Sequence, residues 1–275
     1  MPISVVIPVR NEAANLLRCL EKLERFEEIV VVDSNSDDAT RDIARDAGAS
    51  VIPFDWDGRY PKKRNWYMLN HRPACDWVLF LDADELVSEA FCDEVARAVS
   101  AEDCDGYWLN YTNYFLGRPL KHGDRQRKLA LFRFGKALYE RIDEDSWSGL
   151  DMEVHEHPIV EGKVGEIAAR IDHDDYRGLA QFIDRHRDYA VWEARRTLAL
   201  RGGGNDAWQR LTPRQQKKYR NIGKWWFAWS YFLYCYVLKR GFLDGGPGFA
   251  LAFYKLWYFR TIRLLLREFA GQEGA

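Results

Sequence analysis

The chain has 275 residues, 47% of them hydrophobic and 30% charged, with a formal net charge of −2. This composition is typical of a folded protein with one large domain, or with one domain and an appendage, and no nucleic-acid partner is expected. The five cysteines lack the C-x-x-C pattern and the Cys/His spacing of a metal site, so reduced cytosolic thiols are expected. The N-terminus shows no basic segment followed by a long apolar one, and no signal peptide is predicted.

Strand and helix patterns alternate over the first 105 residues. Strands are expected at 3–9, 28–32, 50–54 and 77–81, and helices at 13–23, 38–47, 62–70 and 88–99. Such a βαβ rhythm predicts an α/β domain with a mostly parallel, Rossmann-like sheet and helices on both faces. Further strands are expected at 107–115 and 128–134 and short β pieces within 155–171, followed by a long helix at 176–200.

Three successive glycines at 202–204 predict the boundary between a domain at 1–204 and a helical region at 205–275. The helical region contains twelve Lys and Arg, four Asp and Glu and five of the eleven Trp, whereas the preceding domain has a net charge of −10. Its two apolar stretches, 225–238 and 249–266, are too short or too charged to span a bilayer. We therefore expect a membrane-associated helical hairpin that lies on an anionic surface.

The segment DWVLFLDADE places three carboxylates at the end of an apolar strand. Val78 to Leu81 read as a buried strand, and Asp82, Asp84 and Glu85 follow it directly. Mutual repulsion makes such a cluster unfavourable unless a cation lies there. Open α/β sheets bind ligands at the carboxyl ends of their strands, so Mg²⁺ or Mn²⁺ in a nucleotide site is expected.

The second strand ends in the same way, because Asp33 follows four apolar residues and should lie level with Asp82 at the sheet edge. We expect Asp33 to contact a ligand, whereas Ser36, Asp37 and Asp38 read as a turn and a helix cap. The first strand is followed by neither G-x-G-x-x-G nor a Walker lysine motif, which argues against a dehydrogenase or a P-loop enzyme.

Four motifs together resemble the family 2 inverting glycosyltransferases of the GT-A fold. They are PVRNE (8–12), VVDSNSDDAT (31–40), the asparagine of KKRN (62–65) and FLDADE (80–85). The resemblance covers residues 1–200 and implies that Asp33 contacts the uracil of a UDP-sugar, that Asp82 holds the ribose and that Asp84 binds the metal. The segments FDWDGRYPKKRNWYM, VHEHP, RHRDYAVWEA and KRGFLDGGPGF further resemble the lipopolysaccharide-core β-glucosyltransferases of Gram-negative bacteria.

An inverting transferase needs one general base to deprotonate the acceptor hydroxyl. Glu156 is our choice, with Asp151 and Glu153 as rivals, because the family places an acidic residue in this region although its E-D form is absent here. The segment at 171–175, which precedes the long helix, reads as a helix N-cap cluster, which suits Asp174 and Asp175, whereas His173 is a candidate for a further metal or diphosphate ligand. The basic residues of PKKRN either form a solvated turn or neutralise nucleotide phosphates, with Arg64 the strongest candidate.

These inferences predict an enzyme that transfers a hexose, with glucose favoured, from a UDP-sugar to a lipid-linked saccharide of the lipopolysaccharide inner core. It would act as a peripheral protein at the cytoplasmic face of the inner membrane. Alternatives are an acceptor that is another envelope glycan or is polyprenyl-linked, a sugar nucleotidyltransferase, and a non-catalytic nucleotide-binding scaffold. The residues expected to bind the nucleotide sugar are Pro8, Asn11, Glu12, Asp33, Lys62, Arg64, Asp82 and Ala83, with Asp84 and His173 on the metal and Glu156 as the base.

Overall fold

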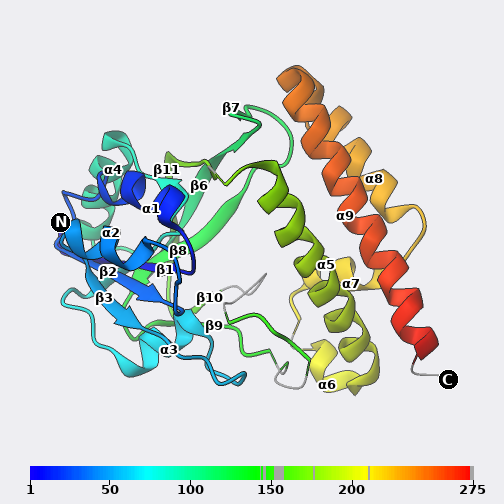
Figure 1. Cartoon of the computed structure of the whole chain (residues 1–275), viewed down its shortest axis with the longest axis horizontal. Coiled ribbons are helices and arrows are strands. Elements are labelled where there is room, and N and C mark those ends of the chain that lie inside the picture. The colour runs from blue at the N-terminus through cyan, green and yellow to red at the C-terminus, as the bar shows by residue number, and fades with distance from the viewer. Residues whose placement is uncertain (143, 145–146, 152–157, 176, 210, 273–275) are drawn as a thin grey trace. The chain divides into compact units, whose positions relative to one another are not determined.

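The computed structural model describes residues 1–142, 144, 147–151, 158–175, 177–209 and 211–272. Its contacts divide the chain into two compact units (Figure 1). Unit 1 comprises Met1–Gly117 and Arg125–Arg177, and unit 2 comprises Arg118–Asp124 and Gly178–Ala275.

Unit 1 is built on a mixed sheet with the strand order β3-β2-β1-β4-β8-β6-β11-β5. Its strands are β1 (Ile3–Val9), β2 (Glu28–Asp33), β3 (Ser50–Pro53), β4 (Trp77–Phe80), β5 (Glu85–Leu86), β6 (Gly106–Phe115), β8 (Arg127–Arg133) and β11 (Val164–His173). The first four strands are parallel, β8 runs antiparallel to both of its neighbours, and β11 is parallel to β6. A separate antiparallel pair joins β9 (Ala137–Tyr139) to β10 (Pro158–Val160).

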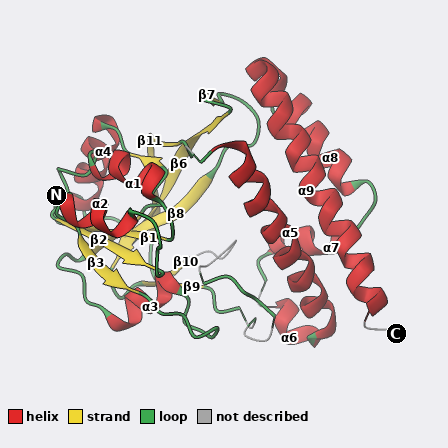
Figure 2. Ribbon diagram, viewed as in Figure 1, coloured by secondary structure: helices red, strands yellow, loops and turns green. Residues whose placement is uncertain are grey.

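The helices of unit 1 are α1 (Ala13–Leu20), α2 (Thr40–Asp46), α3 (Lys63–Asn70) and α4 (Glu89–Ser100). They lie on both faces of the sheet, with α1, α2 and α4 on one side and α3 on the other (Figure 2). All seven residues of β1 are buried, as expected for a central strand covered on both faces. Ser88 caps α4 by accepting a hydrogen bond from the Phe91 amide at 3.2 Å. The α/β architecture predicted from the sequence is therefore present.

Unit 2 is helical apart from β7 (Arg118–Pro119). It contains α5 (Gly178–Gly202), α6 (Gly204–Gln209), α7 (Pro213–Asn221), α8 (Phe227–Leu233), the π-helix η1 (Tyr234–Leu238), the 3₁₀ helix η2 (Gly241–Asp244) and α9 (Gly245–Gln272). Thr212 and Gln215 form the capping box of α7. Helix α8 with its continuation η1 forms one arm of the expected helical hairpin, and α9 forms the other. Among the described residues, no helix has the length and apolar character needed to cross a membrane.

The long helix α5 belongs to unit 2 by its contacts. Ala190 and Ala194 of α5 share a hydrophobic core with Leu256 and Ile262 of α9. The contacts thus divide the chain at Gly178, ahead of α5, whereas the sequence predicts a domain boundary at 202–204. A functional boundary at 202–204 stays a prediction.

Candidate functional site

The carboxylates after β4 meet the end of β11. Strand β5 pairs antiparallel with β11, with Glu85 opposite His173. This pairing brings Asp84 Oδ2 to 3.3 Å from His173 Nε2, and the Asp174 amide donates to the Asp84 carbonyl at 2.9 Å. Asp84 is only 5% exposed. The structure therefore joins the two residues that the sequence assigned to a metal, although they are 89 positions apart.

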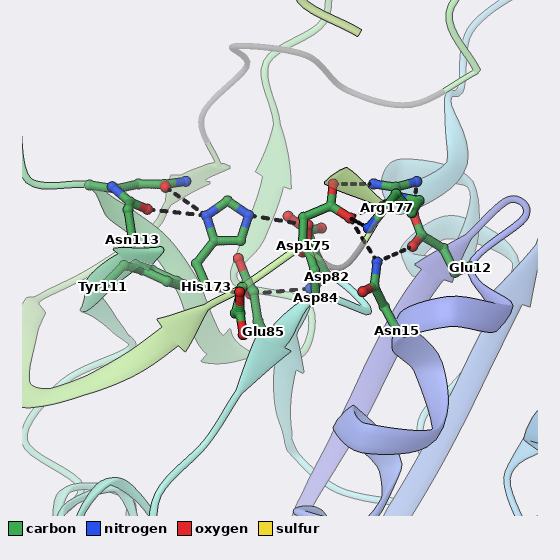
Figure 3. Close-up of polar contacts among 12 residues, drawn as sticks. Glu12, Asn15, Asp82, Asp84, Glu85, Tyr111, Asn113, His173, Asp175 and Arg177 are labelled. Carbon is green, nitrogen blue, oxygen red and sulfur yellow. Dashed lines mark hydrogen bonds and ion pairs between the residues drawn. The ribbon is translucent and has the colours of Figure 1, made fainter. Parts of the chain in front are cut away.

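The imidazole of His173 is oriented by its other nitrogen. Nδ1 lies 3.1 Å from Asn113 Oδ1 and 3.2 Å from Gln126 Oε1 (Figure 3 shows the Asn113 contact). Because amide oxygens only accept hydrogen bonds, Nδ1 carries the hydrogen and Nε2 faces Asp84. Burial lowers the pKa of His173, but the Asp84 carboxylate raises it more, and the net direction is upward.

These donors fit a hard divalent ion. A carboxylate suits a hard divalent ion, and an imidazole whose far nitrogen is held by oxygen acceptors is oriented as metal-binding histidines usually are. Two protein ligands leave the remaining coordination positions to water and phosphate oxygens, as is usual for Mg²⁺ and Mn²⁺ in nucleotide sites. In the described part of the chain, no group of three or more His, Cys, Asp or Glu is placed to hold a metal.

Asp82 lies in a network of charges next to this pair. Arg64 Nη2 is 2.7 Å from Asp82 Oδ1, and Lys128 Nζ is 2.5 Å from Asp82 Oδ2. Lys128 also bonds to Glu85, which Tyr111 contacts at 3.4 Å. Burial raises the pKa of Asp82, but Lys128 and Arg64 lower it more. The net direction is downward, so Asp82 stays ionised. Sequence reasoning missed Lys128; its only signal is a lysine next to the apolar residues of a strand.

Asp33 and Asn11 connect the loops that follow β1 and β2. The carboxylate of Asp33, 1% exposed, accepts hydrogen bonds from the amide of Ser36 at 3.1 Å and from its hydroxyl. The hydroxyl of Ser36 accepts from the Asn11 amide at 2.9 Å, and Asn11 Oδ1 accepts from the Asp37 amide at 3.0 Å. Pro8 is buried within β1, and Ala83, between Asp82 and Asp84, is also buried. Nucleotide contacts of these residues stay predictions.

Glu12 belongs to a second network, which joins the loop after β1 to the residues after β11 (Figure 3). Arg177 Nη1 lies 2.6 Å from Glu12 Oε1, and Arg177 also contacts Asp175 through two nitrogens at 2.9 Å. Asn15 Nδ2 donates to both Glu12 and Asp175 at 3.0 Å. Asn15, Asp175 and Arg177 were not among the predicted site residues, because nothing in their local sequence indicates a partner 165 positions away.

The basic residues at the start of α3 point to different partners. Lys62 Nζ lies 2.5 Å from Glu144 Oε1, and both side chains are buried. Lys63 Nζ donates to the Val9 carbonyl at 2.9 Å and lies 3.3 Å from Asp151 Oδ2. A phosphate contact of Lys62 stays a prediction.

Of the three candidates for the base, the described residues include Asp151 alone. Burial raises the pKa of Asp151, but Lys63 lowers it more, which makes this carboxylate a weaker base. Glu153 and Glu156 lie outside the described residues.

The unusual pKa of Glu12 predicts a pH effect on stability. Burial raises this pKa from the ordinary 4.5 to about 7, against the opposing effect of Arg177. A raised carboxyl pKa favours folding below about pH 4.5, and that contribution is lost as the pH rises to about 7. Glu12→Gln should remove this loss, on the order of 3 kcal/mol. Urea unfolding of the wild type and of Glu12→Gln at pH 4.5 and 8 measures this loss. Glu24→Gln, at an exposed position, should not change the pH dependence of the unfolding free energy. Equal pH dependence in the wild type and Glu12→Gln would contradict the prediction.

Comparisons with known proteins agree with this architecture. Residues 4–151 match the family model described as glycosyl transferase family 2. The chain is 31% identical over 173 residues to the lipopolysaccharide core biosynthesis glycosyltransferase LpsC of Rhizobium meliloti (strain 1021), an alignment that covers 60% of each protein. It is 24% identical over 261 residues to an uncharacterized glycosyltransferase of Rickettsia felis, covering 90% of this chain and 83% of that one.

Two solved structures give more distant similarities. Residues 1–349 of S. aureus TarS, crystallised with UDP-GlcNAc, align with a TM-score of 0.46 and 16% identity over 99% of this chain and 92% of that crystallised chain. Glucosyl-3-phosphoglycerate synthase of Mycobacterium tuberculosis, crystallised with Mn²⁺, UDP and its product, aligns with a TM-score of 0.33 and 24% identity over 42% and 44%. The family match spans more than half of the chain and agrees with the predicted GT-A fold. The chain belongs to glycosyl transferase family 2.

Proposed function

We propose that this protein is an inverting glycosyltransferase that moves a hexose, with glucose favoured, from a UDP-sugar to a lipid-linked saccharide of the lipopolysaccharide inner core. The observation that supports it most is the Asp84–His173 pair, which lies next to the ionised Asp82 just beyond the end of β4. A carboxylate and an imidazole at this edge suit a divalent ion that also binds a nucleotide diphosphate.

In this proposal, three acidic side chains bind the donor. Asp33 contacts the uracil, Asp82 the ribose, and Asp84 with His173 would hold Mg²⁺ or Mn²⁺. The ion, when bound, neutralises negative charge on the diphosphate of the leaving UDP. Asn113 and Gln126 keep the hydrogen of His173 on Nδ1, so that Nε2 is directed at the same point as Asp84. Arg64, which pairs with Asp82 at 2.7 Å, would neutralise phosphate charge as well.

The acceptor side requires a base. Glu156 would take the proton of the acceptor hydroxyl as its oxygen attacks the anomeric carbon from the face opposite UDP, which inverts the configuration. Among its rivals, Asp151 is paired with Lys63, which favours its ionised but weakly basic form.

The acceptor class rests on the similarity to LpsC, which covers 60% of that protein. A screen of UDP-glucose, UDP-galactose and UDP-GlcNAc against a truncated core lipid tests it, with transfer of one hexose in the inverted configuration as the expected result. Transfer only to a polyprenyl-linked acceptor would move the assignment to another envelope glycan. Absence of turnover with bound UDP would favour a non-catalytic scaffold, and formation of a nucleotide sugar would indicate a nucleotidyltransferase.

We also propose that unit 2 binds the cytoplasmic face of the inner membrane as a peripheral surface. Exposed apolar side chains run from the two residues before α8 to the end of η1, and we call this surface the apolar face; it consists of Trp225, Trp226, Trp229, Leu233, Tyr234, Val237 and Leu238. Trp225 is 67% and Leu238 74% exposed, whereas the outer face of a helix in water is normally polar. The exposed Lys224 and Lys239 lie at its two ends and suit anionic headgroups.

Vesicle flotation tests this surface with the full-length chain. The protein should float with anionic vesicles, and added salt should release it, since each Lys or Arg near such a surface contributes about 1 kcal/mol. Replacing Trp229 and Leu233 together by Asp should abolish most of the flotation. The control is Leu69→Asp on α3, which is also exposed but lies in unit 1, and it should float like the wild type. Equal flotation of the Trp229/Leu233 variant would refute the assignment of this face.

A further inference from the structure

The three acidic side chains that follow β4 lie close together but have different partners (Figure 3). Asp84 faces His173 at 3.3 Å. Asp82 and Glu85 instead share one cation, because Nζ of Lys128 bonds both to Oδ2 of Asp82 and to Oε1 of Glu85. The repulsion expected among three neighbouring carboxylates is therefore relieved in part by a lysine of this chain.

Lys128 is held in place by its surroundings. It lies on β8, where its backbone is paired with Leu109 of β6. Its ammonium lies over the ring of Tyr111, with Nζ 5.2 Å from the ring centroid, which is a favourable position for a cation. Burial lowers the pKa of Lys128, but Asp82 and Glu85 raise it more, so the ammonium stays charged.

Glu85 is the buried end of this network. Its side chain is 1% exposed, and its Oε2 accepts a hydrogen bond from the Asp82 amide at 3.1 Å. The hydroxyl of Tyr111 lies 3.4 Å from the same oxygen. The Glu85 amide in turn donates to the Asp82 carbonyl at 3.0 Å, which closes a turn between the two residues. Glu85 thus holds both the backbone of Asp82 and the ammonium of Lys128.

Both oxygens of the Asp82 carboxylate are held by cations from different elements. Nη2 of Arg64, on α3, lies 2.7 Å from Oδ1, and Nζ of Lys128, on β8, lies 2.5 Å from Oδ2. The Asp82 side chain is nevertheless 29% exposed, and each carboxylate oxygen has a second lone pair for a ligand hydroxyl. A side chain that is already held in one orientation loses less conformational freedom when a ligand binds.

We propose that Lys128 is a positioning residue for the nucleoside part of the donor: anchored on Glu85, it holds Asp82 in the orientation that accepts the ribose hydroxyls, while metal binding is left to Asp84 and His173. This inference rests on the proposed function, because it assumes that Asp82 contacts the ribose. A lysine that contacted the diphosphate directly would affect only ligands that carry phosphate.

The test compares UDP with uridine, which has the ribose but no phosphate. Calorimetry measures UDP affinity with and without Mn²⁺, and competition against UDP measures uridine affinity. Lys128→Met removes the charge and should weaken both ligands by the same factor, about 10-fold, as expected when a hydrogen bond to a charged group is lost. The factor by which Mn²⁺ strengthens UDP binding should equal that of the wild type, because Asp84 and His173 are unchanged.

Three further variants complete the test. Lys128→Arg keeps the charge and should recover most of the affinity for both ligands. The double variant Lys128→Met/Glu85→Gln leaves no unpaired buried carboxylate at position 85 and keeps an acceptor for the Asp82 amide; it should show the same losses as Lys128→Met, and it replaces that variant if it fails to fold. The control is Arg127→Met, the preceding residue on β8, which removes an exposed cation paired with Glu166 at 3.0 Å and should bind like the wild type.

The possible results separate this inference from the proposed function. Weakened UDP binding with unchanged uridine binding would place Lys128 on the phosphates and overturn the positioning role. An altered Mn²⁺ factor would place Lys128 at the metal and overturn it as well, as would unchanged affinity for both ligands. Each of these results leaves the proposed function intact, because the wild type still binds UDP with Mn²⁺. Failure of the wild type itself to bind UDP with Mn²⁺ would overturn both.

Discussion

Asp84→Asn should abolish UDP binding that depends on a divalent ion and reduce turnover by about 10²–10³-fold, the size of effect seen when an electrostatic contact at the reaction centre is lost. The amide keeps the size of the carboxylate but not its charge, and therefore binds a hard cation far more weakly. Calorimetry with UDP and Mn²⁺, and hexose transfer with saturating donor, measure the two effects. The buried position of Asp84 beside His173 is the structural basis of this expectation.

Asp76→Asn is the matched control, because Asp76 lies at the opposite end of β4 and is exposed; it should bind and turn over like the wild type. A second control combines Asp84→Asn with His173→Ala. If both side chains hold one ion, the double variant should be little worse than Asp84→Asn alone. Wild-type activity of Asp84→Asn with Mg²⁺ or Mn²⁺ would contradict the metal assignment.

Glu156→Gln should lower kcat by at least about 10²-fold while UDP-sugar affinity is retained. Glutamine is nearly isosteric but cannot take the proton of the acceptor hydroxyl, so the loss should appear in the chemical step and not in donor binding. Steady-state transfer kinetics and calorimetry with the UDP-sugar distinguish these quantities.

The rival bases are tested by Asp151→Asn and Glu153→Gln. Asp151→Asn should also disturb the contact with Lys63, at 3.3 Å, and is expected to change stability more than the proton transfer. A loss of 10²-fold or more in either rival, with Glu156→Gln fully active, would place the base there.

The sequence by itself determined the elements whose signals are local. Apolar runs with Asp33 and Asp82 after them predicted parallel strands and a ligand edge, and Ser88, at the start of the helix expected at 88–99, caps α4. Such signals survive folding because they depend on neighbours a few residues away.

Only the tertiary structure decided which distant side chains share the site. The strand order places β11 between β6 and β5, and this brings His173 to Asp84 and Asn113 across 89 and 60 positions. The Glu12–Arg177 pair likewise spans 165 positions. Neither pairing has a local signal, because residues far apart in the chain meet only through the crossover connections of the sheet, whose order is set by packing of the whole core.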